Sequence, residues 1–117
     1  KADIQPIDSA LARINRVRLV DFRYTPEYRW VHPEIVDRRY PNVIAQEFAE
    51  IFPDDVQGSG EVLPDGSEIL QVDTYPLIIY SAAAIQELHL ENRALKEQIK
   101  EQEARLRKLE LFLLNEN

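Results

Sequence analysis

The clearest pattern in the sequence is a seven-residue repeat of apolar side chains over its last forty or so positions. From Pro76 to the end of the chain no further proline or glycine occurs, and proline itself suits the first turn of a helix. A helix of about 38 residues would be roughly 57 Å long at 1.5 Å per residue. Such a helix would overhang a body built from the remaining residues. Eight of the eleven first and fourth heptad positions are apolar, which predicts a coiled coil.

We expect the helices to associate in parallel, because the charges beside the apolar positions then attract. Glu91 of one chain would face Lys96 of its neighbour. Asn92 and Gln102 would place polar groups inside the interface, where they cost stability but penalise shifted registers. The sequence alone leaves the number of helices open, and a single amphipathic helix lying on its own domain is the alternative. We name the predicted interface the contact face; it consists of Ile78, Ile85, Leu88, Asn92, Leu95, Ile99, Gln102, Leu106, Leu109 and Leu113.

The first quarter of the chain predicts one short helix and one strand. Asp8 or Ser9 could cap about two helical turns that carry Leu11 and Ile14. From residue 17 to residue 24 apolar and polar side chains alternate, which indicates a strand with mixed faces.

Residues 25–41 contain three prolines and show no sustained period, so we expect a long surface excursion and no regular element. Its aromatic residues Tyr28, Trp30 and Tyr40 are expected to anchor this loop on its own domain. A platform on which a ligand stacks is the alternative for these rings.

The middle of the chain predicts a short amphipathic helix followed by a β-hairpin. Apolar residues lie at helical spacing from Ile44 to Phe52, and Pro53 ends the helix because it lacks an N–H donor. The sequence LPDG at positions 63–66 is typical of a turn between two strands. We therefore predict an α+β fold, with a head over residues 1–75 and a coiled-coil helix over residues 76–117.

Composition narrows the possible chemistry. The chain has no cysteine and no methionine, which excludes disulfides and thiol-based sites and leads us to expect a piece of a longer or processed protein. Residues 42–84 hold eight acidic and no basic side chains, so nucleic-acid binding is not expected. No membrane-spanning run occurs. The acidic residues near positions 54–65 lack calcium-loop spacing, and His32 and His89 have no ligand-spaced partner, so we expect neither metal nor cofactor.

Several segments, taken in order, resemble one known family. They are KADIQPI at the start, LARINRVRLVDFRY, VIAQEFAEIFPDDV with its AQE at positions 45–47, and LQVDTYPLIIYSAAAIQEL with its AIQEL at 84–88. Together they resemble the C-terminal intramolecular chaperone auto-processing domain of phage endosialidases, other tailspikes and tail fibres, bacterial surface fibres and myelin regulatory factor. Asn42 departs from this pattern, since glycine usually stands there, but asparagine tolerates positive φ.

The resemblance implies a homotrimer that aligns the fibre or spike region preceding it in the same precursor. It also implies cleavage before a serine that begins a Ser-Asp-x-Arg-x-Lys motif. By this match Lys1 is the lysine that acts as the base, and the serine nucleophile lies five positions upstream, so this chain by itself cannot cut.

Three contexts are open for such a chain. The resemblance implies a virion tail fibre or a bacterial surface fibre. The first alternative is a membrane-tethered transcription factor that the same domain trimerises and frees by cleavage. The second is a coiled-coil trimerisation module with no chemistry.

Overall fold

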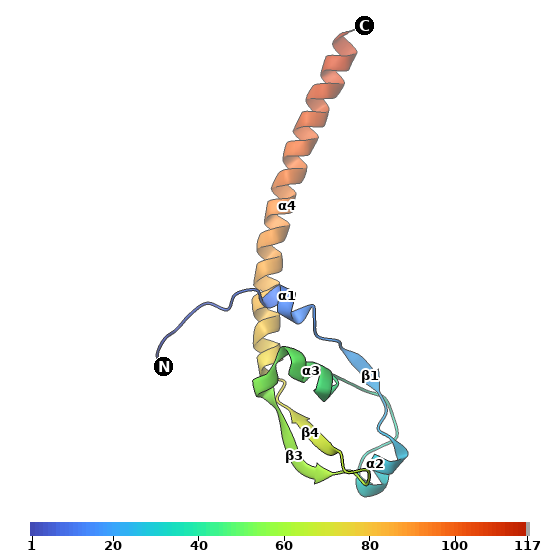
Figure 1. The fold of residues 1–117 in the computed structure, drawn as a ribbon. Helices are drawn as coiled ribbons and strands as arrows, with labels where there is room; N and C mark the ends of the chain where they lie inside the picture. Colours follow the sequence, from blue (N-terminus) through green and yellow to red (C-terminus); the bar gives the residue numbers. More distant parts are fainter. Residues whose placement is uncertain (117) are drawn as a thin grey trace.

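The molecule is a small head from which one long helix projects (Figure 1). The structure is a computed structural model, and it describes residues 1–116. Its Cα radius of gyration is 24.1 Å, whereas a compact chain of this length would have about 13 Å. The head combines short helices with two small antiparallel hairpins, so the α+β prediction is confirmed.

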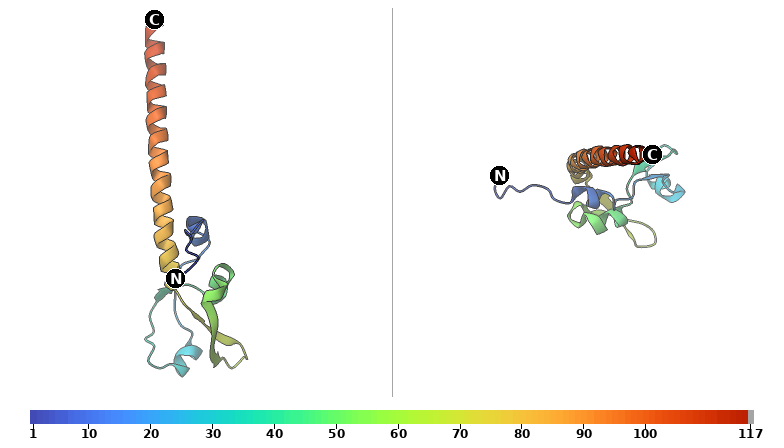
Figure 2. Two further views of the ribbon diagram at one scale, coloured as in Figure 1. Left: turned by 90° about the vertical axis from the view of Figure 1, so that its left-hand side faces the viewer. Right: turned by 90° about the horizontal axis from the view of Figure 1, so that it is seen from above.

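The long helix, α4, spans Tyr75–Asn115 and contains 41 residues. Pro76 lies in its first turn, where a missing N–H costs nothing. Only its first part packs on the head, and every residue from 88 to 116 is exposed (Figure 2). The predicted long helix is therefore confirmed. None of the helices within residues 1–116 combines the length and apolar character that crossing a membrane requires.

The first helix, α1, spans Ala10–Ile14 and lies against α4 (Figures 1 and 2). It is shorter than the two turns predicted. The predicted cap is also wrong, because Ser9 adopts a left-handed conformation with φ of 57° and its side chain makes no capping hydrogen bond. A side chain from α4 takes over this role, as described below.

Strand β1 (Val20–Phe22) pairs antiparallel with β2 (Tyr40–Asn42). The segment between them was expected to be irregular, and this prediction is wrong, because it contains helix α2 (Pro26–Val31). The Thr25 hydroxyl accepts a hydrogen bond from the backbone N–H of Tyr28. Threonine followed by proline is a helix start signal, and here it outweighs the other breakers around it.

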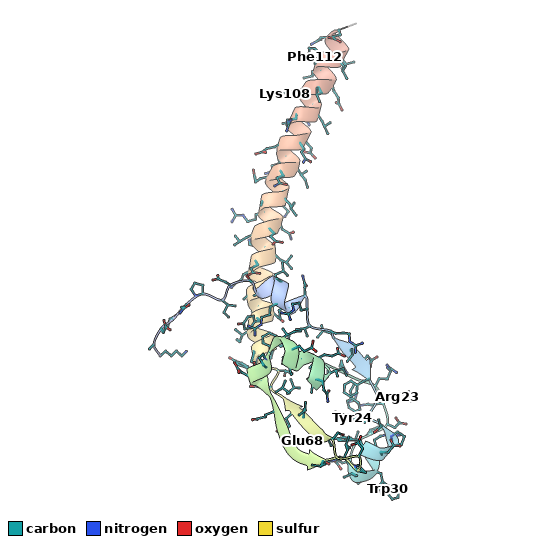
Figure 3. All side chains as sticks on the ribbon, in the orientation of Figure 1. Arg23, Tyr24, Trp30, Glu68, Lys108 and Phe112 are labelled. Carbon is teal, nitrogen blue, oxygen red and sulfur yellow. The ribbon has the colours of Figure 1, made fainter. Side chains whose placement is uncertain are left out.

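The aromatic residues of this segment divide into a cluster and one exposed ring. Tyr24 stacks on Tyr28 with ring centroids 5.1 Å apart and meets Tyr40 edge-on at 5.3 Å. Trp30, in contrast, is 88% exposed at the end of the head farthest from α4 (Figure 3). Tyr28 and Tyr40 therefore pack within the head as expected, whereas the anchoring role expected of Trp30 is wrong.

Helix α3 (Ala45–Ile51) is followed by a 3-10 turn, η1 (Pro53–Asp55), and by the predicted hairpin. Its strands are β3 (Val56–Val62) and β4 (Glu68–Val72), which pair antiparallel. The core is small and centres on α3. Its buried residues are Val43, Phe48, Ile51 and Phe52, with Leu77 and Tyr80 of α4 packed against them.

Candidate functional site

The residue predicted to act as the base lies at the end of an extended segment. We call residues 1–9 the N-terminal arm; all of them are exposed. The arm leaves the junction of α1 and α4 and points away from both (Figure 1), and even Ile4 is 83% exposed. Lys1 is exposed as well.

The contact face runs along the projecting part of α4 and is uncovered in the single chain. Its apolar side chains are between 43% exposed, at Leu88, and 66% exposed, at Ile85. Asn92 and Gln102 are exposed as well. Large apolar side chains repeated along a helix that nothing covers are typical of an interaction surface. The apolar members are Ile78, Ile85, Leu88, Leu95, Ile99, Leu106, Leu109 and Leu113.

Glu87 of α4 caps helix α1. Its Oε1 accepts a hydrogen bond of 3.0 Å from the backbone N–H of Ala10, and its Oε2 accepts one of 2.7 Å from that of Leu11. The first amides of a helix lack partners within the helix, and a carboxylate beside them is also favoured by the helix dipole. Ala10 is fully buried and Ala84 is 4% exposed, and small side chains at this junction let the two helices approach closely.

Arg13 of α1 links three elements of the head. Its guanidinium donates to the backbone carbonyl of Ile51 at 2.7 and 3.2 Å and to the Tyr80 hydroxyl at 2.8 Å. The same group lies over the Phe52 ring, 4.2 Å from its centroid, and 4.8 Å from that of Tyr80. The carbonyl of Ile51 belongs to the last turn of α3, where helical carbonyls lack partners. Arg13 thus ties α1 to α3 and to α4.

An ion pair joins the segment before β1 to α3. Arg18 donates to both carboxylate oxygens of Glu47, at 2.8 and 2.6 Å. These bonds from Arg18 lower the pKa of Glu47 below its ordinary value, and the carboxylate in turn raises the pKa of Arg18. Glu47 is the acidic residue of the AQE sequence. This residue of the motif therefore has a structural role in the chain, as the partner of Arg18.

His32 joins the α2 segment to the hairpin. Its Nε2 lies 2.7 Å from Oε1 of Glu61 on β3, its Nδ1 lies 3.4 Å from Glu34, and its ring stacks on Tyr28 at 4.4 Å. The hydrogen bond with Glu61, helped by both carboxylates, raises the pKa of His32. Within residues 1–116 no group of three or more His, Asp or Glu side chains is placed to hold a metal ion.

Residues 1–57 match the family model described as the chaperone of endosialidase. This matched segment includes the N-terminal arm, α1 with Arg13, and α3 with the AQE and Phe52-Pro53 sequences. Three of the four segments that carry the resemblance lie within the match, and the fourth, at residues 70–88, lies outside it. The match supports the resemblance of this part of the chain to the chaperone of endosialidase family. The same match supports a chaperone role.

The chaperone match ends before the hairpin strands and α4, yet the two parts are in direct contact. Glu87 and Tyr80, which lie beyond the matched residues, hold α1, which lies within them. Sequence reasoning identified neither contact. The available signal for Glu87 was its place in the AIQEL sequence.

Proposed function

We propose that this chain is an intramolecular chaperone that forms a parallel trimer and aligns a fibre or spike region preceding it in the same precursor. In this proposal residues 1–75 form the head and residues 76–117 the trimerising helix. The family match over residues 1–57 supports the chaperone role. The observation that carries the trimer is the contact face, which is uncovered over the projecting length of α4.

Alignment has a definite physical purpose in this proposal. Chains of an elongated β-structure must begin in register, because a slipped register turns apolar side chains outward and leaves strand edges unpaired. Tethering the ends of three chains raises the effective concentration of the correctly paired strands. A coiled coil with two polar layers sets this register, since Asn92 and Gln102 penalise any shift.

The proposal includes release of the chaperone by self-cleavage. A serine five positions before Lys1 attacks the carbonyl carbon of the peptide bond that precedes it, and Lys1 accepts the hydroxyl proton. The proton passes to the leaving amine, and water then hydrolyses the ester and leaves the upstream chain with a new carboxylate. A lysine acts as a base near neutral pH only when burial or a nearby cation lowers its pKa. Because the arm is exposed in the single chain, assembly would have to provide this burial, which makes cleavage follow trimerisation.

Molar mass in solution tests the trimer. The chain at tens of micromolar should have three times its mass of 13.6 kDa, or about 41 kDa, by light scattering. Ile99→Asp places a charge inside the contact face and should reduce the mass to that of the monomer. The matched change Glu101→Gln, two positions away outside the contact face, should leave it unchanged. A monomeric unaltered chain would refute the trimer.

Expression of a precursor tests the cleavage. A precursor with the Ser-Asp-x-Arg-x-Lys sequence ending at Lys1 and a fibre segment before it should yield two fragments. Changing the serine to alanine, or Lys1→Met, should leave an intact precursor of unchanged oligomeric mass. Fragments from the serine variant at the same site would show that another protease cuts there.

A further inference from the structure

We propose that Glu87 couples the assembly of α4 to the position of the N-terminal arm, and so acts as a positioning residue for self-cleavage. This inference rests on the function proposed above and adds a residue to it. Glu87 lies far from Lys1 in sequence and touches neither the scissile bond nor the base. It acts through α1, whose first two amides it holds.

The place of Glu87 on α4 is what gives it this role. It lies between Ile85 and Leu88, which belong to the contact face and are 66% and 43% exposed. The Glu87 carboxylate points to α1 of its own chain instead. One turn of α4 therefore carries both the surface that meets neighbouring chains and the group that holds the start of α1. Fixing this turn by assembly fixes the point from which the arm departs.

The tether shortens the free chain that carries Lys1. With α1 held on α4, Lys1 lies eight positions from the turn at Ser9, and this length of chain reaches at most about 27 Å. When the first turn of α1 opens, the next fixed residue is Arg13, which lies twelve positions from Lys1. The effective concentration of a flexible segment at its target falls roughly with the −3/2 power of its length, so an increase from eight to twelve positions lowers it about twofold.

The contacts around Glu87 explain why its loss would release α1. The helix has five residues, too few to be stable without tertiary contacts. Ser9 contributes no side-chain cap, so removal of the carboxylate leaves the amides of Ala10 and Leu11 without these acceptors. Arg13 still holds the other end of α1 through Ile51 and Tyr80, so we expect α1 to open from its first turn, which is where the arm begins.

The test compares Glu87→Ala with Glu101→Ala, a matched glutamate two heptads along on the same side of α4. In the chain itself, hydrogen exchange at the amides of Ala10 and Leu11 should accelerate in Glu87→Ala and stay unchanged in Glu101→Ala. In the precursor, Glu87→Ala should slow cleavage about twofold at unchanged oligomeric mass. If Glu87→Ala lowers the mass, Glu87→Gln, which keeps the side-chain size, replaces it in the same comparison.

Equal cleavage rates in the Glu87 and Glu101 variants would overturn the proposed role of Glu87 in cleavage. Equal hydrogen-exchange rates at the amides of Ala10 and Leu11 would overturn the claim that Glu87 holds α1. Failure of the proposed function has a different signature. An unaltered precursor that stays intact would refute self-cleavage, and with it any role of Glu87 in cleavage. Exchange at the two amides would still decide whether Glu87 holds α1.

Discussion

The position of Arg13 leads to a quantitative prediction for the variant Arg13→Ala. The change removes a charged donor from the Ile51 carbonyl and from the Tyr80 hydroxyl, and a cation from above the Phe52 ring. Hydrogen bonds from a charged group contribute about 1.5 kcal/mol at the lower end of their range, and a partly exposed cation–π contact contributes about 0.5–1 kcal/mol. We expect the free energy of unfolding to fall by about 3.5–4 kcal/mol, which is large beside the roughly 4–11 kcal/mol that a head of this size would have.

Urea denaturation followed by near-ultraviolet circular dichroism measures this loss. That signal reports the packed aromatic rings of the head, whereas the far-ultraviolet signal is dominated by α4. Protein concentration must be held constant, because association contributes to the apparent stability. Arg13→Lys keeps the charge but lacks the forked geometry of the guanidinium, so it should lower the free energy of unfolding by about half as much as Arg13→Ala. Arg16→Ala removes an exposed arginine from the same region and should change stability by less than about 0.5 kcal/mol. Equal effects of Arg13→Ala and Arg16→Ala would refute the reasoning.

Two further predictions concern pH. The pKa of His32 is raised, so its contribution to stability is fully present below the ordinary pKa of 6.5 and is lost as pH rises through the raised value. The urea midpoint of the unaltered chain should therefore exceed that of His32→Gln most at pH 6 and least at pH 8.5; a constant difference would contradict this. The pKa of Glu47 is lowered by Arg18, so its contribution is present above pH 4.5 and is lost as pH falls through the lowered value. The urea midpoint of the unaltered chain should exceed that of Glu47→Gln near neutral pH, and this difference should shrink in acid. A difference that persists at pH 2 would show that the charge of Glu47 is not its source.

Local patterns in the sequence were sufficient to predict much of the fold. The heptad repeat and the absence of breakers predicted α4, and the LPDG turn predicted the hairpin of β3 and β4. Helix α3 was predicted from its apolar spacing and from Pro53. In each case the determining interactions lie within a few residues of one another, which is the range that periodicity and turn chemistry report.

The junction at α1 could not be predicted in the same way. A serine at the start of a helix normally caps it, but Ser9 has a left-handed backbone and the cap comes from Glu87. Helix α2 was not predicted because the three prolines of its segment favour an irregular loop. The start signal at Thr25 and Pro26 nevertheless begins a helix. For Lys1 and the contact face, a single chain supplies the location of each side chain but not the neighbouring chains on which their proposed roles depend.

The contact between α1 and α4 also sets the order of events during synthesis. The amide of Ala10 and the carboxylate of Glu87 are separated by 77 positions in the chain. At the usual rate of about 5–20 residues per second, α1 emerges roughly 4–15 s before its cap exists. Any segment that precedes residue 1 is made earlier still. The head is thus completed only after the chain it is proposed to align has been synthesised, so alignment begins from the last-made end of each chain.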